Sequence, residues 1–168
     1  MKLNFGCGDH KLDGFVGVDK LKTKAADIIH DMNVFPYPFR NDSVEEALLS
    51  NILEHLHDTI GVINEIWRVC KNEATVRIIV PYYNSPGACN DPTHVRFFTE
   101  RTFDYFTKDG ITFFSEYNYY SFGRFEIIAV IPSQRKIFAI VPKRVQWFLA
   151  HHLATIHSIE FILKVVKE

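Results

Sequence analysis

The amino-terminal segment, residues 1–19, constrains this chain more than any other part of it. Residues 3–8 form a short apolar strand that runs into a turn bracketed by two glycines, and residues 15–19 form a second strand that ends in a carboxylate. Gly6 and Gly8 allow the main chain to turn sharply and to approach a ligand without a Cβ atom in the way. Strand, glycine turn and strand in this order predict a ligand site at the carboxyl edge of a sheet.

The kind of ligand follows from what the turn contains and what it lacks. Asp19 stands where such sheets place an acceptor for ribose hydroxyls. The dinucleotide fingerprint needs a third glycine that opens a helix and an acidic residue about 20 residues further on. Here His10 stands in place of the third glycine, and the acidic residue, Asp19, comes much sooner. The short connection to Gly14 leaves little room for the helix amino terminus that a diphosphate needs. We predict a nucleoside-type cofactor site; an ordinary glycine-rich corner without a ligand is the alternative.

Composition limits the remaining possibilities. With 168 residues and a net charge of −1, we expect one domain over residues 1–168 and no attraction to nucleic acid. Three irregularly spaced cysteines indicate a reducing, cytoplasmic compartment without disulfides. Because the chain begins directly with a strand, we expect no signal peptide. Residues 145–163 are mostly apolar but carry several histidines and Glu160, so we expect a helix followed by a strand and no membrane insertion.

The rest of the chain alternates strands with helices, which predicts a mostly parallel sheet. We expect further strands at residues 26–30, 46–50, 75–80, 125–131, 136–141 and 159–166. The strand at 46–50 has contiguous apolar residues, as in a sheet buried on both faces. We expect a helix that Asp58 caps and that ends at Lys71-Asn72, a long loop at 82–96, a short helix that Thr99 caps, and a helix at 143–157.

Seven blocks of sequence, in this order, resemble the class I S-adenosylmethionine-dependent methyltransferases, in particular the group called methyltransferase type 11-like. They are LNFGCG at 3–8, GFVGVD at 14–19, HDM at 30–32, PYPF at 36–39, LEHL at 53–56, RVCK at 68–71 and DPTH at 91–94. The resemblance implies an α/β, Rossmann-like methyltransferase fold. Its seven-stranded sheet is mostly parallel with an antiparallel last strand, and helices cover both faces.

The same resemblance implies S-adenosylmethionine as cofactor, S-adenosylhomocysteine as product, and a set of cofactor-binding residues. These are Gly6, Cys7, Gly8, Asp19, Asp31, Met32, Ser50 and Asn51. The glycine turn is expected to contact the amino-acid part of the cofactor, Asp19 the ribose, and Asp31 with the Met32 backbone the adenine. Ser50 and Asn51 are expected near the methyl group. The chain departs from many relatives at Asn4, where they carry an acidic residue for the cofactor's ammonium group.

The chemistry agrees with this cofactor independently of the resemblance. A sulfonium has no phosphate to bind, so a short turn without a helix suffices, and the cofactor itself supplies the reactive group. The protein must mainly hold an acceptor atom in line with the methyl group. A general base is needed only when the acceptor is a hydroxyl or a protonated amine.

His94 and His55 are the candidate catalytic bases, because both are expected at the carboxyl edge of the sheet. The plain alternative is that each only caps a helix or holds a loop in place. We expect no metal site. His55 and His57, together with His94 or Asp91, could supply ligands, but alternate residues of an extended segment point in opposite directions. There is also neither a Cys-x-x-Cys pair nor a His-Glu-x-x-His run.

The sequence therefore favours an S-adenosylmethionine-dependent methyltransferase that acts on a small-molecule or glycan-type acceptor as a monomer or homodimer. A non-catalytic protein of the same fold that binds the cofactor or serves as a scaffold is the alternative, motivated by Asn4. A nicotinamide-dependent oxidoreductase shares the fold class but lacks its fingerprint here.

Overall fold

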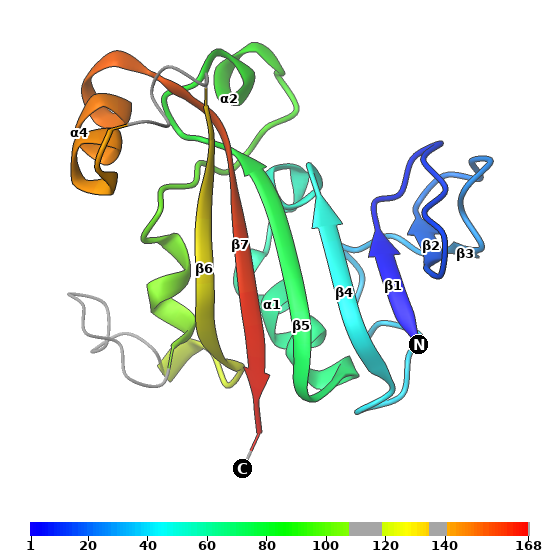
Figure 1. Cartoon of the computed structure of the whole chain (residues 1–168). Coiled ribbons are helices and arrows are strands. Elements are labelled where there is room, and N and C mark those ends of the chain that lie inside the picture. The colour runs from blue at the N-terminus through cyan, green and yellow to red at the C-terminus, as the bar shows by residue number, and fades with distance from the viewer. Residues whose placement is uncertain (108–118, 135–140, 168) are drawn as a thin grey trace.

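A computed structural model describes residues 1–107, 119–134 and 141–167, which form a seven-stranded sheet in the order β3-β2-β1-β4-β5-β7-β6 (Figure 1). The strands are β1 (Lys2–Phe5), β2 (Val16–Asp19), β3 (Ile28–Ile29), β4 (Val44–Ser50), β5 (Cys70–Pro81), β6 (Arg124–Gln134) and β7 (Ile156–Val166). Strands β1 to β5 pair in parallel, and β7 runs antiparallel to both of its neighbours. This is the predicted sheet, with the antiparallel last strand.

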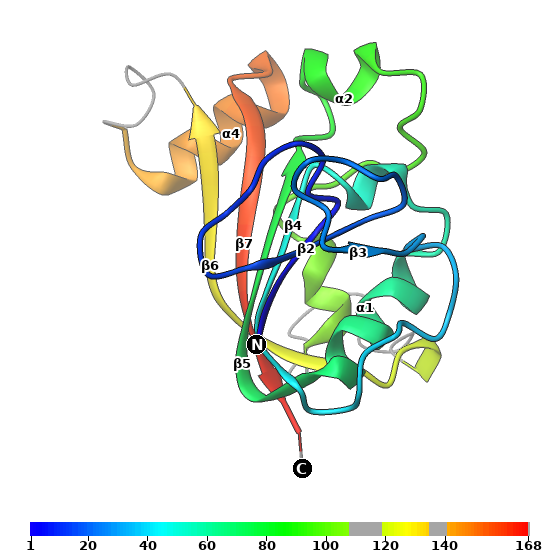
Figure 2. The same ribbon diagram turned by 90° about the vertical axis from the view of Figure 1, so that its right-hand side faces the viewer.

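Helices lie on both faces of the sheet, as predicted. They are the 3₁₀ helices η1 (Leu53–His55) and η2 (Thr102–Phe106) and the α-helices α1 (Thr59–Val69), α2 (Pro86–Asn90) and α4 (Lys143–Leu153). Helix α1 covers one face, and α4 lies towards the other side near one end of β6 and β7 (Figure 2). Asp58 caps α1 as predicted: its Oδ1 accepts a hydrogen bond from the Gly61 N–H at 2.8 Å.

The core lies between the sheet and α1. Along β5, Val76, Ile78 and Val80 are fully buried. Arg77 points to the opposite face and pairs with Glu160 of β7 at 2.6 Å. The same alternation runs through β4, where every second residue from Glu46 to Ser50 is only half-buried. The expectation of a fourth strand buried on both faces is therefore wrong: its apolar run packs on one face only.

Several boundaries differ from the sequence-based expectations. The third strand is reduced to two residues because it lies at the sheet edge and pairs only with β2. Helix α1 ends at Val69, and β5 starts at Cys70 without the expected asparagine turn. The expected loop at 82–96 contains the short helix α2, which Ser85 caps through a hydrogen bond from the Ala88 N–H.

The later half shows one further correction. Thr99 does not cap η2, which is a 3₁₀ helix with Arg101 at its N-cap position; instead the Thr99 N–H donates to Thr102 Oγ1 at 2.9 Å. The stretch at 145–163 divides into α4 and β7, as predicted, but the helix ends at Leu153 and not at residue 157, because Ala154 turns to φ +50° and β7 already begins at Ile156. No helix in the described parts of the chain is long and apolar enough to cross a membrane. The strand expected at 136–141 lies, apart from Val141, outside the described residues.

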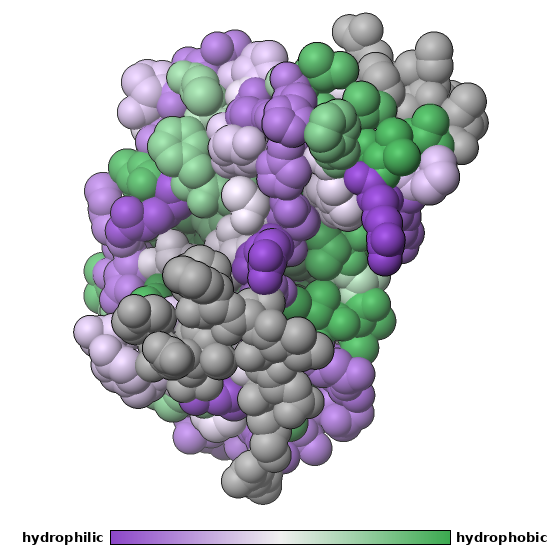
Figure 3. Space-filling model, turned by 90° about the vertical axis from the view of Figure 1, so that its left-hand side faces the viewer, coloured by the Kyte–Doolittle hydropathy of each residue, from purple (hydrophilic) through white to green (hydrophobic). Residues whose placement is uncertain are grey.

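Strand β6 is the last in the strand order of the sheet, and apolar side chains reach the surface there. Ile128 and Ile131 on this strand are about half exposed, at 54% and 45%. Figure 3 views the molecule from this side and shows hydrophobic side chains between hydrophilic ones.

Two charged residues of α1 hold the loop that follows β3. The Arg68 guanidinium donates to both carboxylate oxygens of Glu65 at 2.7 Å and to the carbonyl oxygens of Tyr37 and Phe39. Glu65 in turn accepts a hydrogen bond from the Tyr37 N–H at 2.7 Å. This network joins two of the sequence blocks. PYPF lies in the loop, and RVCK carries Arg68, which binds that loop.

We expect Glu65→Gln to destabilise the protein by about 1.5 kcal/mol or more at pH 7, because hydrogen bonds to a charged group are lost. Burial by itself raises the pKa of Glu65, but the hydrogen bonds from Arg68 and Tyr37 outweigh it and place the pKa below its usual range. A lowered folded-state pKa means that the stabilisation is present above about pH 4.3 and is lost as the pH falls through the folded-state value.

Urea unfolding of both proteins between pH 7 and about pH 3.5 checks this expectation. The difference in unfolding free energy is expected to shrink at the acidic end. Glu45→Gln, which removes exposed ion pairs with Lys71 and with the amino terminus, serves as the control and is expected to cost less than Glu65→Gln at pH 7. An equal cost for Glu65→Gln at every pH contradicts the account.

Candidate cofactor site

A cavity of about 620 Å³ lies at the carboxyl ends of β1, β2 and β4, within the size range of small-molecule sites. It is lined by Gly6, Gly8, Asp19, Lys20, His30, Asp31, Met32, Asn33, Asn51, Ile52, His55, Leu56, His57, Thr93 and Val95. The position is the one at which open α/β sheets bind ligands.

Most of the residues that the sequence singled out meet at this cavity. Gly6, Gly8, Asp19, Asp31, Met32, Asn51 and His55 line it. Cys7 and Ser50 line an adjoining hollow of about 440 Å³, which shares Gly6 and Asn51 with the cavity. His94 lines neither; its side chain is 8% exposed and lies behind His55, with the two ring centroids 4.6 Å apart.

The glycine turn has the backbone conformation that the sequence predicts. Gly6 has φ +67° and Gly8 has φ +51°, values that residues with a side chain rarely adopt. A Cβ atom at Gly6 would lie only 2.6 Å from the Ile52 side chain, which itself lines the cavity. The turn therefore brings bare main chain to the edge of the cavity.

Asp19 is held rigidly at the end of β2. Its Oδ2 accepts a hydrogen bond from the Gly8 N–H at 2.9 Å, and its Oδ1 accepts one from the Leu21 N–H, also at 2.9 Å. Each carboxylate oxygen has a second lone pair, so the group still has capacity to accept hydroxyl hydrogens from a ligand. The carboxylate thus joins the glycine turn to the second strand and faces the cavity.

Cys7, between the two glycines, is buried, and burial raises the pKa of its thiol. A raised pKa keeps the thiol protonated at neutral pH, so it is a poor nucleophile. Cys7 is thus suited to the tight turn as a small residue and not as a nucleophile.

Asp31 and Met32 form the opposite wall. Asp31 Oδ1 accepts hydrogen bonds from the Asn33 N–H and side-chain amide at 2.9 and 3.2 Å. The Met32 carbonyl accepts the hydroxyl hydrogen of buried Tyr37 at 2.9 Å. Because the Glu65–Arg68 network holds Tyr37, α1 fixes this wall of the cavity from behind.

The third wall follows β4. Asn51 has φ +52°, and its N–H donates to the Ile79 carbonyl of β5 at 2.8 Å, so the chain turns away from the sheet here. Helix η1 comes next and places His55 at the cavity. The ring Nδ1 of His55 lies 2.9 Å from Thr93 Oγ1, and that hydroxyl is 2.6 Å from Asp91 Oδ1.

Burial and the nearby His94 lower the pKa of His55, and burial raises the pKa of the neighbouring carboxyl of Glu54. Both shifts disfavour charge on groups withdrawn from water. His55 is therefore neutral at pH 7.

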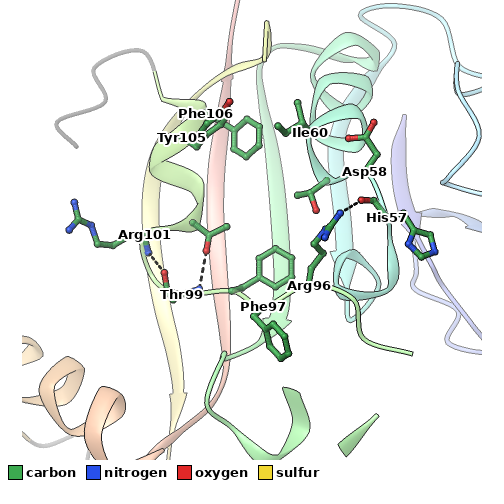
Figure 4. A pocket seen from close by; sticks show the side chains of 12 residues that line it. His57, Asp58, Ile60, Arg96, Phe97, Thr99, Arg101, Tyr105 and Phe106 are labelled. Atoms are coloured by element: carbon green, nitrogen blue, oxygen red, sulfur yellow. Dashed lines mark hydrogen bonds between the residues drawn. The ribbon is translucent and has the colours of Figure 1, made fainter. Parts of the chain in front are cut away.

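A second cavity, of about 490 Å³, opens beside the first, and His57 lines both. Helix α1 contributes Ile60 on one side and η2 contributes Tyr105 and Phe106 on the other (Figure 4). Arg96 lies beside His57 and donates a hydrogen bond to the His57 carbonyl (Figure 4). The lining combines the rings of Phe97, Phe98, Tyr105 and Phe106 with polar and charged residues.

Sequence reasoning missed several residues of the main cavity, among them Lys20, Ile52, Thr93 and Val95. Lys20 and Ile52 directly follow predicted site residues, so a search one residue further along each strand end finds them. Thr93 belongs to the DPTH block that carried the resemblance. The approach of Val95, whose N–H donates to the Glu54 carbonyl at 2.8 Å, has no sequence signal.

Comparison with known proteins bears on the fold. No family model matches the chain, and no curated protein matches it. Solved structures do match. An S-adenosylmethionine-dependent methyltransferase from Methanosarcina mazei has a TM-score of 0.62 at 15% identity, covering 99% of this chain and 92% of its own.

Two further structures agree. A methyltransferase from Archaeoglobus fulgidus has a TM-score of 0.58 at 15% identity, covering 97% of this chain and 85% of its own. A type 11 methyltransferase from Sulfolobus solfataricus has a TM-score of 0.56 at 15% identity, covering 100% and 85%. The chain therefore has the fold of the class I S-adenosylmethionine-dependent methyltransferases.

Proposed function

We propose that the protein binds S-adenosylmethionine in the cavity at the ends of β1, β2 and β4 and transfers its methyl group to a small-molecule or glycan-type acceptor. The observation that carries this proposal is the joining of Gly6, Gly8, Asp19 and Asp31 around one cavity of suitable size. The fold supports it, because the solved structures with this fold include S-adenosylmethionine-dependent methyltransferases.

Each wall of the cavity suits one part of this cofactor. Asp19 offers two oxygens for the ribose hydroxyls, and Asp31 with the Met32 main chain suits the adenine. The glycine turn exposes main chain for the amino-acid part, together with Cys7 of the adjoining hollow. Ser50 and Asn51, at the end of β4, are then the residues nearest to the methyl group.

Methyl transfer requires of the protein mainly that it hold the two reactants in the correct position. The methyl group leaves a positively charged sulfur, so charge is lost at the sulfur as the bond to the acceptor forms. In this proposal the protein holds the acceptor atom in line with the methyl carbon and keeps water away. His55 faces the cavity as a neutral imidazole able to accept a proton, and His94 packs behind it.

Isothermal titration with S-adenosylhomocysteine tests the cofactor assignment. We expect one-to-one binding and a rise in melting temperature, and no binding of NADH under the same conditions. An absence of heat and of thermal shift at millimolar S-adenosylhomocysteine contradicts the proposal. NADH binding in its place indicates an oxidoreductase.

The second candidate is a protein that binds the cofactor without turnover. It is favoured by Asn4, which is buried, lines the hollow beside the glycine turn and brings no negative charge for the cofactor's ammonium group. Incubation with S-adenosylmethionine and a panel of hydroxyl, amine and sugar acceptors separates the two. Methylated product that is lost in His55→Ala supports the enzyme, and binding without any product supports the second candidate.

A further inference from the structure

We propose that Glu54, His55 and His94 bind a divalent transition-metal ion in the wall of the cofactor cavity. One donor atom from each of the three side chains lies within 4.8 Å of the other two. Two imidazoles with one carboxylate form a ligand set that suits Zn²⁺ and related first-row metals and leaves coordination positions open. The sequence-based expectation of no metal weighed His55 and His57 with His94 or Asp91; the structure instead brings the buried carboxyl of Glu54 to His55 and His94.

Glu54 is the strongest evidence for a ligand at this place. The residue is only 1% exposed, and neither of its carboxylate oxygens has a hydrogen-bond partner among the described residues. A buried carboxylate without a partner is costly, and such groups are normally paired or coordinate a metal. An ion between the three side chains supplies the missing partner.

The hydrogen bonds of both imidazoles involve Nδ1 and leave Nε2 available to bind a metal ion. Nδ1 of His94 lies 3.2 Å from the Ala88 carbonyl, which can only accept, so Nδ1 carries the hydrogen. Thr93 donates its hydroxyl hydrogen to the Asp91 carboxylate, so its oxygen accepts from Nδ1 of His55. Nε2 of each ring therefore keeps its lone pair.

This arrangement is the one that surrounds metal-bound histidines, whose second nitrogen usually donates to a carbonyl, a carboxylate or another fixed acceptor. Asp91 adds negative charge nearby, with Oδ2 at 3.8 Å from Nε2 of His94. Ligand atoms around one zinc ion lie roughly 3.3 Å apart. The donor atoms of the three side chains, now within 4.8 Å of one another, therefore move closer together by about 1 Å or slightly more when the ion binds.

The position of the site suggests what its open coordination positions bind. His55 and Thr93 line the cofactor cavity, whereas Glu54 and His94 lie behind them. Because His55 and Asn51 line the same cavity, an ion among the three borders the space in which the proposed function places the methyl group. If that function holds, the ion binds an acceptor through a hydroxyl oxygen and lowers the pKa of that hydroxyl. With the ion bound, His55 holds the metal and does not take the proton, which passes to solvent. The oxygen then bonds to the methyl carbon, and the carbon–sulfur bond breaks with its electron pair on sulfur.

Metal titration of the chelator-treated full chain tests the site. We expect one equivalent of Zn²⁺ to bind in competition with a chromogenic chelator, and one equivalent of Co²⁺ to give visible d–d absorption bands. Glu54→Gln and His94→Ala are each expected to weaken Zn²⁺ binding by more than about 100-fold, because loss of a ligand exceeds the 10- to 100-fold cost of losing a supporting residue. Thr93→Val, which removes only the support of His55, is expected to fall within that range.

His152→Ala is the matched control, because this histidine is exposed on α4 and far from the cluster in sequence. We expect it to bind Zn²⁺ like the unaltered protein. Failure of the unaltered chain to bind either metal overturns the proposal, and so does unchanged binding in both Glu54→Gln and His94→Ala. Melting curves without metal show whether each variant folds; Glu54→Gln is expected to melt no lower than the parent, since it removes a buried unpaired carboxylate.

S-adenosylhomocysteine titration with and without Zn²⁺ keeps the two proposals apart. Metal binding without S-adenosylhomocysteine binding leaves the metal site standing and contradicts the proposed function. S-adenosylhomocysteine binding without metal binding contradicts the metal site and leaves the proposed function standing.

Discussion

Asp19→Ala is expected to weaken binding of S-adenosylhomocysteine by roughly 10²- to 10⁴-fold. The reason is the loss of two hydrogen bonds from ribose hydroxyls to a charged acceptor, each worth about 1.5–3 kcal/mol. The substitution also frees the Gly8 and Leu21 N–H groups, which Asp19 now holds at 2.9 Å. Isothermal titration measures the affinity, and thermal melting reports whether the fold is kept.

Two further variants sharpen this prediction. Asp19→Asn retains an oxygen for the glycine turn but removes the charge, so we expect an intermediate loss of affinity. Asp13→Ala, in the exposed loop between β1 and β2, is the control and is expected to bind like the parent. An unchanged affinity in Asp19→Ala contradicts the ribose-binding role, and a loss of equal size in Asp13→Ala shows that the effect is not specific.

Phe161→Ala is expected to lower the free energy of unfolding by about 3–5 kcal/mol, the usual cost of removing a buried aromatic ring. Phe161 is fully buried in the middle of β7, and its ring centroid lies 4.5 Å from that of Phe103 in η2. The ring therefore joins the antiparallel strand to the helical layer. Denaturation by urea or guanidinium chloride measures the loss.

Phe148→Ala provides the matched control, because its ring lies on α4 and is 61% exposed. Its expected effect is within about 0.5 kcal/mol. Phe161→Leu retains most of the apolar contact and is expected to lose less, so it gives a measurable result if Phe161→Ala fails to fold. A cost below about 1 kcal/mol for Phe161→Ala contradicts the described position of β7.

The fold could be predicted largely from local sequence signals. The predicted and observed strands differ in length where pairing with a neighbouring strand sets the strand's ends. The strands at β1, β2 and β6 were recognisable from short apolar runs between turn residues. β5 is longer than expected because Cys70 to Ala74 continue directly from α1 and Cys70 pairs with Val44 across a bulge. β3 is shorter because it has one partner strand, an effect that its own residues do not encode.

Part of the candidate site was also predictable. Residues that end a strand, such as Asp19 and Ser50, follow from the rule that strand ends meet at one edge of a sheet. His55 and His94 were both expected at this edge, but the addition of Glu54 to them was not predictable, because it depends on the chain after β5 returning to η1. The hydrogen bond from the Val95 N–H to the Glu54 carbonyl forms where the chain returns. No periodicity or motif in the sequence predicts this contact.

A crystal structure of the protein with S-adenosylhomocysteine tests the central claim most directly. The account predicts that the ribose hydroxyls lie within hydrogen-bond distance of the Asp19 carboxylate and that the adenine lies beside Asp31 and Met32. The amino-acid part is expected over the turn from Gly6 to Gly8, with the sulfur towards Asn51. An empty corner, or the ligand bound elsewhere on the molecule, contradicts the account.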